Sequence, residues 1–445
     1  MMSSLLSSLY ASAKRFLSSL FHVFMDMHET EGDAEQTRLP RLPDEIWFRI
    51  LTHVPAEDLQ RLKSVSTSWW KEITSKKFAA SHLERWRSNS PCGIIAITVP
   101  RNLSNIIFGE GVAISYLNLE LNGKDERVQS RSLRLECLVN YLIHRHGMRK
   151  YSELRIDVLD SCDGIILVAI FGYYFFENTI LLLVFNPVTR CYKLLPFWKS
   201  KFKRPYIEDH RWRIICSSTI GRYKIIGWIA CVEFLDCHVC DFELHKQQEE
   251  GNWVSWKELR CPPMYCRSFI NANLYANGKL YWLSVHKYRL GQEHVKAAAL
   301  LSLDIATEEF NIVASGFPEP YPKRTSYPTH RLASNGRFYH VHYQSPNTME
   351  IWVLDNFDNP VWTRQRAISL PCLGYDVDGD EYLVPVAILD GEEYLIMAKE
   401  WTEMFACDMR SGEWREIAMV DFDQLAPPGG QPYYVCHTDS LISWD

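Results

Sequence analysis

The chain has 445 residues, of which 47% are hydrophobic and 23% are charged, and its formal net charge is −6 at pH 7. This composition is typical of a folded protein with two or three domains, and the negative charge excludes recruitment of nucleic acid or an anionic membrane by the field of the whole molecule. The longest apolar run, from Gly164 to Phe176, has 13 residues, too few for a membrane span of roughly 20.

Residues 1–37 form a serine-rich leader, which we expect to be disordered or loosely helical. An organelle-targeting segment would be rich in arginine, whereas Lys14 and Arg15 are the only basic residues of this leader. We therefore do not expect the leader to direct the protein to an organelle. The 13 cysteines are scattered, which favours a reducing compartment, the cytoplasm or the nucleus or both, over a disulfide framework.

Residues 38–88 are predicted to form a small domain of three short helices. Pro43 stands where a first helical turn tolerates proline, and Pro55 ends the first helix because proline lacks the N–H group that would continue it. Ser66 or Thr67 can cap the third helix. The recurrent apolar positions of the domain are Leu42, Pro43, Ile46, Ile50, Leu51, Val54, Leu59, Leu62, Val65 and Trp69.

This helical domain carries more apolar surface than it can bury by itself. A unit of about 50 residues buries little of its own surface. Leaving such side chains in water forgoes roughly 1.5 to 3 kcal/mol each. We therefore expect the surplus to be covered, either by the rest of the chain or by another protein.

Residues 89–445 are predicted to be all-β, because short runs rich in Val, Ile, Leu, Phe, Tyr and Trp alternate with turn residues. One recurrent signal is an Asx-Gly or Gly turn before a strand, because tight hairpins need the positive φ angles that these residues tolerate. Such turns are expected at Asp163-Gly164, Gly221, Asn277-Gly278, Asn335-Gly336 and Asp390-Gly391.

A second signal, Asx-x-x-Ser/Thr-x-x-aromatic, follows the first and is headed by Asn186, Asp304 and Asp408. We expect the Asx side chain to bond the backbone of the turn, with the aromatic residue starting the returning strand. Longer versions are expected at Asp241 and Asp355, so the signal recurs every 51 to 63 residues. A kelch-type β-propeller produces this repeat, whereas a β-sandwich explains only the turn spacing.

The expected fold class is therefore α+β in two domains, a three-helix domain followed by a kelch-like β-propeller of about six blades, with seven as the alternative. A degenerate blade is expected between Cys92 and about Tyr151. The carboxyl-terminal run from Pro432 to Trp444 is predicted to pair with the first blade and so close the ring.

The helical stretch from Leu42 to Phe78 resembles an F-box, the motif that docks onto the Skp-type adaptor of SCF (Skp–cullin–F-box) ubiquitin ligases. The match runs through Leu42-Pro43, Val54-Pro55 and the apolar positions given above. Ser64 and Trp70 stand where cysteine and arginine are common in the motif. The resemblance implies that the ten apolar residues contact the adaptor, although some of them must hold the three helices together instead.

The β-rich part resembles the F-box-associated domain of a large family of plant proteins with kelch-like repeats. The resemblance rests on Ser161-Cys-Asp-Gly and on the run from Phe185 to Pro196. It implies a non-catalytic substrate-recognition subunit, in which the F-box binds the adaptor and through it the cullin-RING ligase, while the propeller binds a protein target for ubiquitination. A non-degradative adaptor-binding protein and a catalytic propeller oxidase are the alternatives.

No metal or cofactor is expected from the residue patterns. Cys237 and Cys240 lie three apart in a predicted strand and so face opposite sides of it, with Cys261 and Cys266 beyond. The acidic run at Asp376, Asp378 and Asp380 lacks the glycine and glutamate of a calcium loop. The pairs His144/His146 and His340/His342 each lack a third ligand nearby in the sequence.

The target-binding residues cannot be read from a general code, because propeller specificity lies in surface loops. A basic run from Lys199 to Arg213 favours a solvated loop over a nucleic-acid surface, with an acidic or phosphorylated target segment as the functional alternative. The candidate loop residues are Lys201, Lys203, Arg204, Arg211, Tyr173 and Tyr174.

Overall fold

The structure is a computed structural model of the whole chain, and it divides into two compact units. The helical unit contains residues 1–85 with 439–441, and the propeller unit contains residues 86–438 with 442–445. The residues that the structure describes are 43–88, 93–98, 113–118, 154–172, 179–196, 198–199, 210–216, 222–230, 235–243, 256–261, 266–290, 293–314, 329–334, 336–345, 347–354, 356–370, 383–389, 394–399, 403–417, 433–437 and 440–443.

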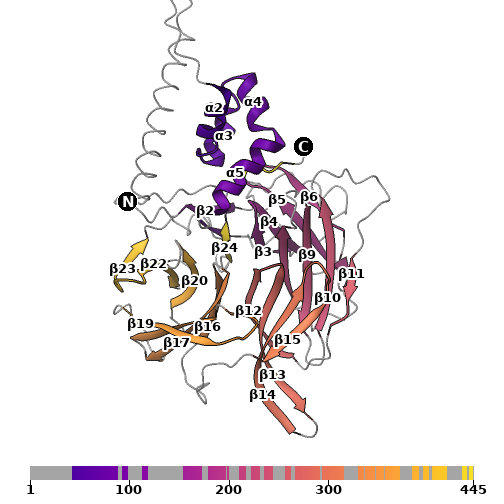
Figure 1. The fold of residues 1–445 in the computed structure, drawn as a ribbon, viewed down its shortest axis with the longest axis vertical. Coiled ribbons are helices and arrows are strands. Elements are labelled where there is room, and N and C mark those ends of the chain that lie inside the picture. Colours follow the sequence, from indigo (N-terminus) through magenta and orange to yellow (C-terminus); the bar gives the residue numbers. More distant parts are fainter. Residues whose placement is uncertain are drawn as a thin grey trace, which may run out of the picture. The chain divides into compact units, whose positions relative to one another are not determined.

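The described part of the helical unit contains four helices, shown in indigo in Figure 1. Pro43 precedes the first helix, as predicted. The first helix ends at Leu51, and Pro55, which was predicted to end it, precedes the second helix instead. The Ser66 hydroxyl caps the third by accepting a bond from the Trp69 N–H at 3.1 Å. The sequence predicted three helices in this domain, and the structure has a separate fourth helix after them, whose start is capped by Ser75. The helices are α2 (Asp44–Leu51), α3 (Ala56–Leu62), α4 (Thr67–Ile73) and α5 (Lys76–Ser88).

A compact core holds these helices. His82 is fully buried on α5, and its Nε2 lies 2.9 Å from the carbonyl oxygen of Val54, which joins α5 to the turn after α2. The Phe48 and Phe78 rings meet edge to face at 5.3 Å. The fully buried apolar side chains of the described helices are Leu51, Val54, Ala56, Leu59, Ile73, Phe78 and Leu83.

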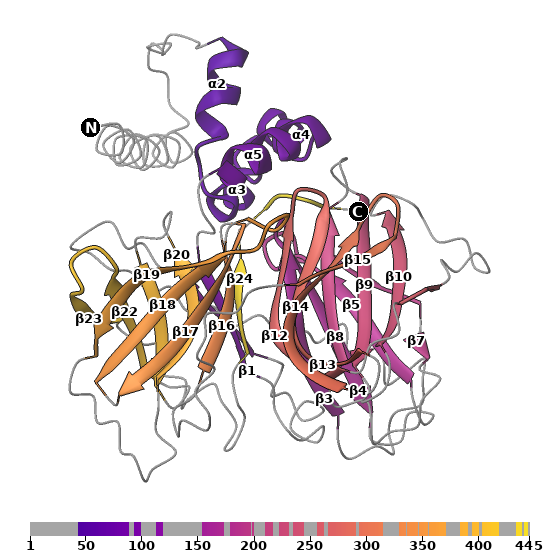
Figure 2. The same cartoon turned by 60° about the horizontal axis from the view of Figure 1, so that its bottom comes forward.

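The described strands of the propeller unit form six antiparallel sheets, visible in Figures 1 and 2. The three-stranded sheet has the order β2 (Ala113–Asn118), β1 (Gly93–Thr98), β24 (Tyr433–His437). The next sheet contains β3 (Leu154–Cys162), β4 (Ile165–Gly172), β5 (Thr179–Phe185) and β6 (Tyr192–Leu194), with β7 (Trp198–Lys199) also paired to β5.

The other four sheets each contain four consecutive strands. The first contains β8 (His210–Cys216), β9 (Arg222–Ala230), β10 (Leu235–Glu243) and β11 (Lys257–Leu259), and the second contains β12 (Cys266–Ala276), β13 (Lys279–Leu290), β14 (Glu293–Asp304) and β15 (Phe310–Ala314). The third contains β16 (Thr329–Ser334), β17 (Arg337–Ser345), β18 (Thr348–Leu354) and β19 (Trp362–Ser369). The fourth contains β20 (Leu383–Leu389), β21 (Tyr394–Lys399), β22 (Glu403–Asp408) and β23 (Trp414–Ile417).

The first strands of neighbouring sheets lie next to one another, as in a propeller. β3 contacts β8, β12 contacts β16, and β16 contacts β20. The predicted closing strand is confirmed, because β24 pairs with β1 from Gly93 opposite His437 to Ile97 opposite Tyr433, and it also contacts β3. Among the described residues, five sheets are complete blades, and the three-stranded sheet stands where the degenerate blade was predicted.

The apolar core of this unit lies between the faces of neighbouring sheets. One cluster joins β9 and β10 to β13 and β14 through side chains that include Trp228 and Trp282, whose rings meet edge to face at 4.9 Å. Another joins β17 and β18 to β21 and β22 through Ile351 and Met397. Each blade therefore depends on the next for burial of its face, as expected for a repeat architecture.

The predicted Asx-Gly turns have the backbone that the sequence requires. Asp163 and Gly164 have φ angles of 55° and 77°, and Asn277 and Gly278 have 52° and 75°. Both central residues of a tight type I′ hairpin turn need positive φ. The turn at Asp390-Gly391 lies outside the described residues.

The second turn signal has the same geometry in three blades. The Oδ1 atom of Asn186, Asp304 or Asp408 accepts bonds from the N–H groups two and three residues later, at 2.7 to 3.2 Å. In the turn between β18 and β19 the residue in this role is Asn356, one position beyond the predicted Asp355, which lies outside the described residues. Short-range hydrogen bonds therefore set the repeat that the sequence displays.

Gly227 provides a direct test of packing within a blade. It lies opposite Trp212 in the β8–β9 register, and a Cβ atom at Gly227 would lie 2.1 Å from the buried Trp212 ring. We expect Gly227→Ala to destabilise the propeller by about 2 kcal/mol or more, because overpacking a dense core forces its neighbours to move. Denaturant unfolding would measure this, and the cost should be smaller in a Trp212→Phe background. An equal cost in both backgrounds would contradict the steric explanation.

Because two thiols of the propeller unit are buried, we expect its free energy of unfolding to decrease at alkaline pH. Burial, followed by the charge of the adjacent aspartate, raises the pKa of Cys240 and of Cys407 to about 12. An unfolded thiol titrates near 8.5, so between that pH and 12 the unfolded state releases protons that the folded state keeps. Stability should be unaffected below about pH 8 and should then fall by up to about 1.4 kcal/mol per pH unit for each thiol. Melting temperatures from pH 7 to 10 would show this, with a shallower decline in Cys240→Ala/Cys407→Ala.

Candidate functional site

The apolar side chains of the helical unit divide into a buried and an exposed set. Leu51, Val54 and Leu59 are at most 3% exposed. Ile46 is 41% exposed, and Pro43 is also exposed. Leu42 lies outside the described residues, and the remaining predicted contact residues, which are half-buried, are Ile50, Leu62, Val65 and Trp69.

Two tryptophans that are absent from the ten predicted positions also lie outside the buried set. Trp70 is 53% exposed on α4, and Trp47 on α2 is half-buried with its ring 5.6 Å from that of Trp69. Exposed tryptophan is a useful signal, because large apolar side chains at a surface mark interaction sites. In the sequence, the adjacent pair Trp69-Trp70 could have indicated Trp70 as a contact residue. We call the set Pro43, Ile46, Trp47, Ile50, Leu62, Val65, Trp69 and Trp70 the helical patch.

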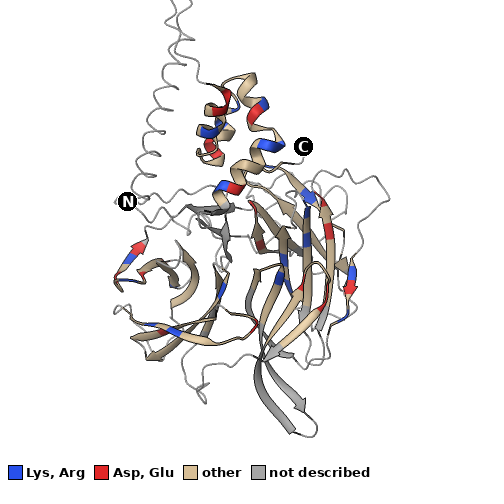
Figure 3. Ribbon diagram, in the orientation of Figure 1, with Lys and Arg blue, Asp and Glu red and all other residues tan. Residues whose placement is uncertain are grey.

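The helices that carry the helical patch also carry charged residues at positions that suit the helix dipole. Asp44 and Glu45 occupy the first turn of α2, where the helix dipole favours negative charge, and Lys71 occupies the last turn of α4. The Lys77 ammonium lies 5.6 Å from the centre of the Phe48 ring. Figure 3 shows both signs of charge along these helices. These helices therefore offer exposed apolar side chains together with charges of both signs.

The predicted loop residues of the propeller are only partly described. Arg211 lies in β8, opposite Trp228 of β9, and is half-buried. Tyr173, Tyr174, Lys201, Lys203 and Arg204 lie outside the described residues. The loop candidates therefore remain predictions.

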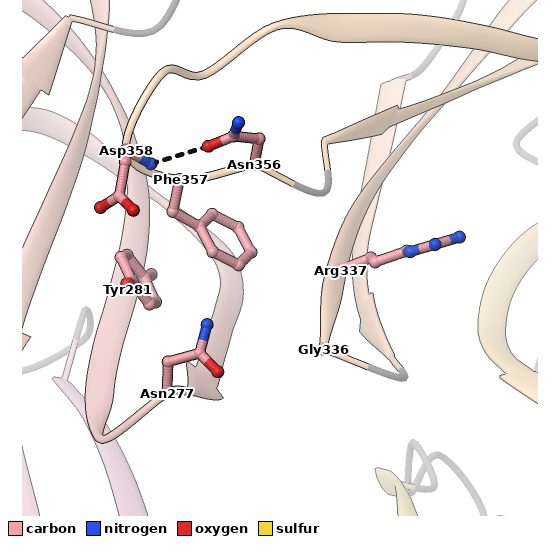
Figure 4. A pocket seen from close by; sticks show the side chains of 7 residues that line it. All are labelled: Asn277, Tyr281, Gly336, Arg337, Asn356, Phe357 and Asp358. Atoms are coloured by element: carbon pink, nitrogen blue, oxygen red, sulfur yellow. Dashed lines mark hydrogen bonds between the residues drawn. The ribbon is translucent and has the colours of Figure 1, made fainter.

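A polar pocket lies between two neighbouring blades of the propeller unit (Figure 4). Three turns form it, those between β12 and β13, between β16 and β17, and between β18 and β19. Its volume is about 450 Å³, within the range of small-ligand sites. The lining residues are Asn277, Tyr281, Gly336, Arg337, Asn356, Phe357 and Asp358.

The pair His340 and His342 lies on one face of β17, as the sequence spacing allows. Their rings are parallel within 5° with centres 6.3 Å apart. Glu350 of β18 stands opposite His342, is 5% exposed, and forms an ion pair of 2.5 Å with Arg364. Burial lowers the pKa of His342 more than Glu350 raises it, which favours the neutral imidazole.

The structure also locates Cys237 and Cys240, the closely spaced pair that the sequence analysis considered as metal ligands. Cys237 and Cys240 are both buried in β10, where Cys237 stands opposite Trp228 and Cys240 opposite Ile225. Across the described ranges, no group of three His, Cys, Asp or Glu side chains could hold a metal ion.

Comparison with known proteins identifies two family matches. The family described as "F-box associated beta propeller domain" matches residues 118–443, and the family described as "F-box domain" matches residues 39–78. The chain is similar to the F-box/LRR-repeat/kelch-repeat protein At1g09650 of Arabidopsis thaliana, at 23% identity over 90% of this chain and 96% of that protein. It is also similar to the F-box/kelch-repeat protein At3g44120 of the same plant, at 23% identity over 62% of each chain.

Among solved structures, the chain is similar to the β-propeller domain of the Trilobed protease from Pyrococcus furiosus. The identity is 10% over 75% of this chain and 82% of that chain, and the TM-score is 0.35. Within the described residues, no helix has both the length and the apolar character needed to cross a membrane.

Proposed function

The chain belongs to the family of proteins with an F-box associated beta propeller domain, and from this premise we propose that it is the substrate-recognition subunit of an SCF E3 ubiquitin ligase. The match to the F-box domain over residues 39–78 implies binding to a Skp-type adaptor. The observation that supports the proposal best is the helical patch, an apolar surface with Ile46 at 41% and Trp70 at 53% exposure.

We assign the nine described residues among the ten predicted positions to two roles, and Leu42 lies outside the described residues. Leu51, Val54 and Leu59 are buried and hold the helices together, so they act on the adaptor only by positioning other residues. The helical patch contacts the adaptor directly. Covering side chains of this kind contributes roughly 1.5 to 3 kcal/mol for each large one, and a few buried aromatic and aliphatic residues dominate such interfaces.

The propeller unit holds the target protein, and the chain itself makes and breaks no bond. Catalysis is by proximity, because a target held on the propeller presents its lysine side chains at high effective concentration to the ubiquitin-charged enzyme that the ligase recruits. The protein therefore acts in the cytoplasm, the nucleus or both, where the ligase is found.

The proposal is tested by purifying the full chain from cells treated with a proteasome inhibitor, in parallel with an Ile46→Asp variant. We expect the adaptor and cullin to co-purify with the natural chain alone. Proteins that bind both forms, but are ubiquitinated only with the natural chain, are the targets. If bound proteins carry equal ubiquitin with both forms, the receptor role is wrong. If the adaptor binds but no bound protein changes in ubiquitination or amount, a non-degradative role replaces it.

A further inference from the structure

The pocket between the blade of β12–β15 and the blade of β16–β19 has an aromatic floor with a carboxylate at its edge (Figure 4). We propose that it binds a basic side chain, arginine or lysine, of the target protein. This inference rests on the proposed function, since it assigns one contact of the target-binding unit. All the residues that line the pocket belong to the propeller unit.

Packed aromatic rings form the floor of the pocket. The Phe357 ring is 7% exposed, lies stacked on Tyr281 with centres 4.4 Å apart, and meets Phe338 edge to face at 6.0 Å. These rings belong to the apolar cluster that joins the two blades, which also contains Trp362. A floor built in this way closes the base of the pocket without rearrangement of the protein, and the contacts to a ligand come from the polar groups around it.

The acidic edge of the pocket is held by a turn. The Asn356 Oδ1 atom accepts bonds from the N–H groups of Asp358 and Asn359, both at 3.1 Å. Figure 4 shows the Asp358 carboxylate next to Tyr281, on the same side as the Phe357 ring. Burial raises the pKa of Tyr281, and the negative charges of Asp358 and Asp304 raise it further.

The remaining walls suit a long side chain with several N–H donors. Gly336 has a φ of 72°, and a Cβ atom added to it would meet nothing within 4 Å, so this wall is open backbone. Asn277 is exposed on the opposite wall, where its amide oxygen can accept a bond. Arg337 also lines the pocket, but in Figure 4 its guanidinium extends away from Asp358 and Phe357. The Arg337 guanidinium therefore does not occupy the acidic edge, where a cation of the ligand can bind.

The test measures binding of small probes to the full chain by saturation-transfer NMR. The probes are N-acetylarginine amide, its uncharged isostere N-acetylcitrulline amide, and N-acetylglutamate amide. We expect the arginine probe to bind at least fivefold more tightly than the citrulline probe, and the glutamate probe not to bind. Asp358→Ala should weaken arginine binding about tenfold, because it removes the charged acceptor of the hydrogen bond from the guanidinium.

Asp358→Ala should leave the fold intact, because Ala306 and Arg410 occupy the same place in the equivalent turns headed by Asp304 and Asp408. Arg410→Ala is the matched control, and it should not change arginine binding. Arginine binding that is equal to citrulline binding, or unchanged by Asp358→Ala, would overturn the proposal, as would preferential binding of the glutamate probe. The assay contains no adaptor, so its failure leaves the ligase role untouched, and loss of the ligase role leaves its result valid.

Discussion

Ile46→Asp is expected to weaken adaptor binding at least 100-fold while the helical unit stays folded. Ile46 is 41% exposed in the free chain, so a carboxylate there remains in water until the adaptor covers it. In the complex the carboxylate would be buried without a partner, and the apolar contact would also be lost. The two effects together exceed the roughly 2.7 kcal/mol that corresponds to a 100-fold change. Calorimetric titration of the full chain with purified adaptor measures the change.

Two control variants separate a contact role from a folding role. Val361→Asp places the same charge at a propeller residue that is 54% exposed, and it should leave adaptor binding unchanged. Leu59→Asp introduces the charge at a residue with 0% exposure, so it should unfold the helical unit and lower the helical circular-dichroism signal. If Ile46→Asp binds the adaptor as tightly as the natural chain does, Ile46 is not part of the interface. If Ile46→Asp loses the helical circular-dichroism signal, the loss of binding results from unfolding.

Trp70 gives a finer measure of the same surface. It is 53% exposed, more than any other large apolar side chain of the described helices. If the adaptor covers it, Trp70→Ala should weaken binding roughly 10- to 100-fold, since buried tryptophan is a frequent hot spot in interfaces. Trp70→Arg, which restores the residue common at this position in the motif, should retain more affinity than Trp70→Ala. Equal affinities for the natural chain and Trp70→Ala would place Trp70 outside the interface.

Removing residues 433–445 is expected to abolish cooperative folding of the propeller unit. This deletion removes β24, which pairs with β1 along five residues and contacts β3. Without β24 the three-stranded sheet loses one of its end strands, β1 is left with an unpaired edge, and β3 loses a neighbouring strand. The lost pairing and burial are comparable with the total stability of a domain, about 5 to 15 kcal/mol. Denaturant unfolding followed by tryptophan fluorescence should show no single sharp transition.

A shorter deletion isolates the contribution of β24. Removing residues 438–445 keeps β24 but removes Ile442, whose carbonyl oxygen accepts bonds from the Asn186 Nδ2 at 2.9 Å and the Thr189 Oγ1 at 3.0 Å. The buried Asn186 amide would then lose this hydrogen bond, which costs about 1 to 3 kcal/mol, so we expect a weakened but still cooperative transition. If both deletions unfold alike, the strand pairing is not what closes the ring.

Features set by neighbouring residues were predictable from the sequence. The helix start at Pro43, the cap at Ser66 and the turns at Asp163-Gly164 and Asp304 all depend on contacts within a few residues. The closing role of the carboxyl-terminal strand was also predictable, because a repeat that ends with an unpaired strand leaves two edges to be joined. The prediction placed the head of the turn after β18 at Asp355, whereas Asn356 has this role, because adjacent Asp355 and Asn356 both fit the turn.

The division of the apolar residues was decided only by the packing of the helices. Ile46, Leu51 and Leu59 are alike in hydrophobicity, yet their exposures are 41%, 2% and 0%, because the crossing of the helices determines which side chains meet. The pocket likewise combines Asn277, Gly336 and Phe357 from separate turns of two blades. The sequence by itself therefore determined the elements and the turns between them, which follow from short-range bonding. The tertiary structure alone decided which surfaces stay open, because burial depends on residues that are distant in the chain.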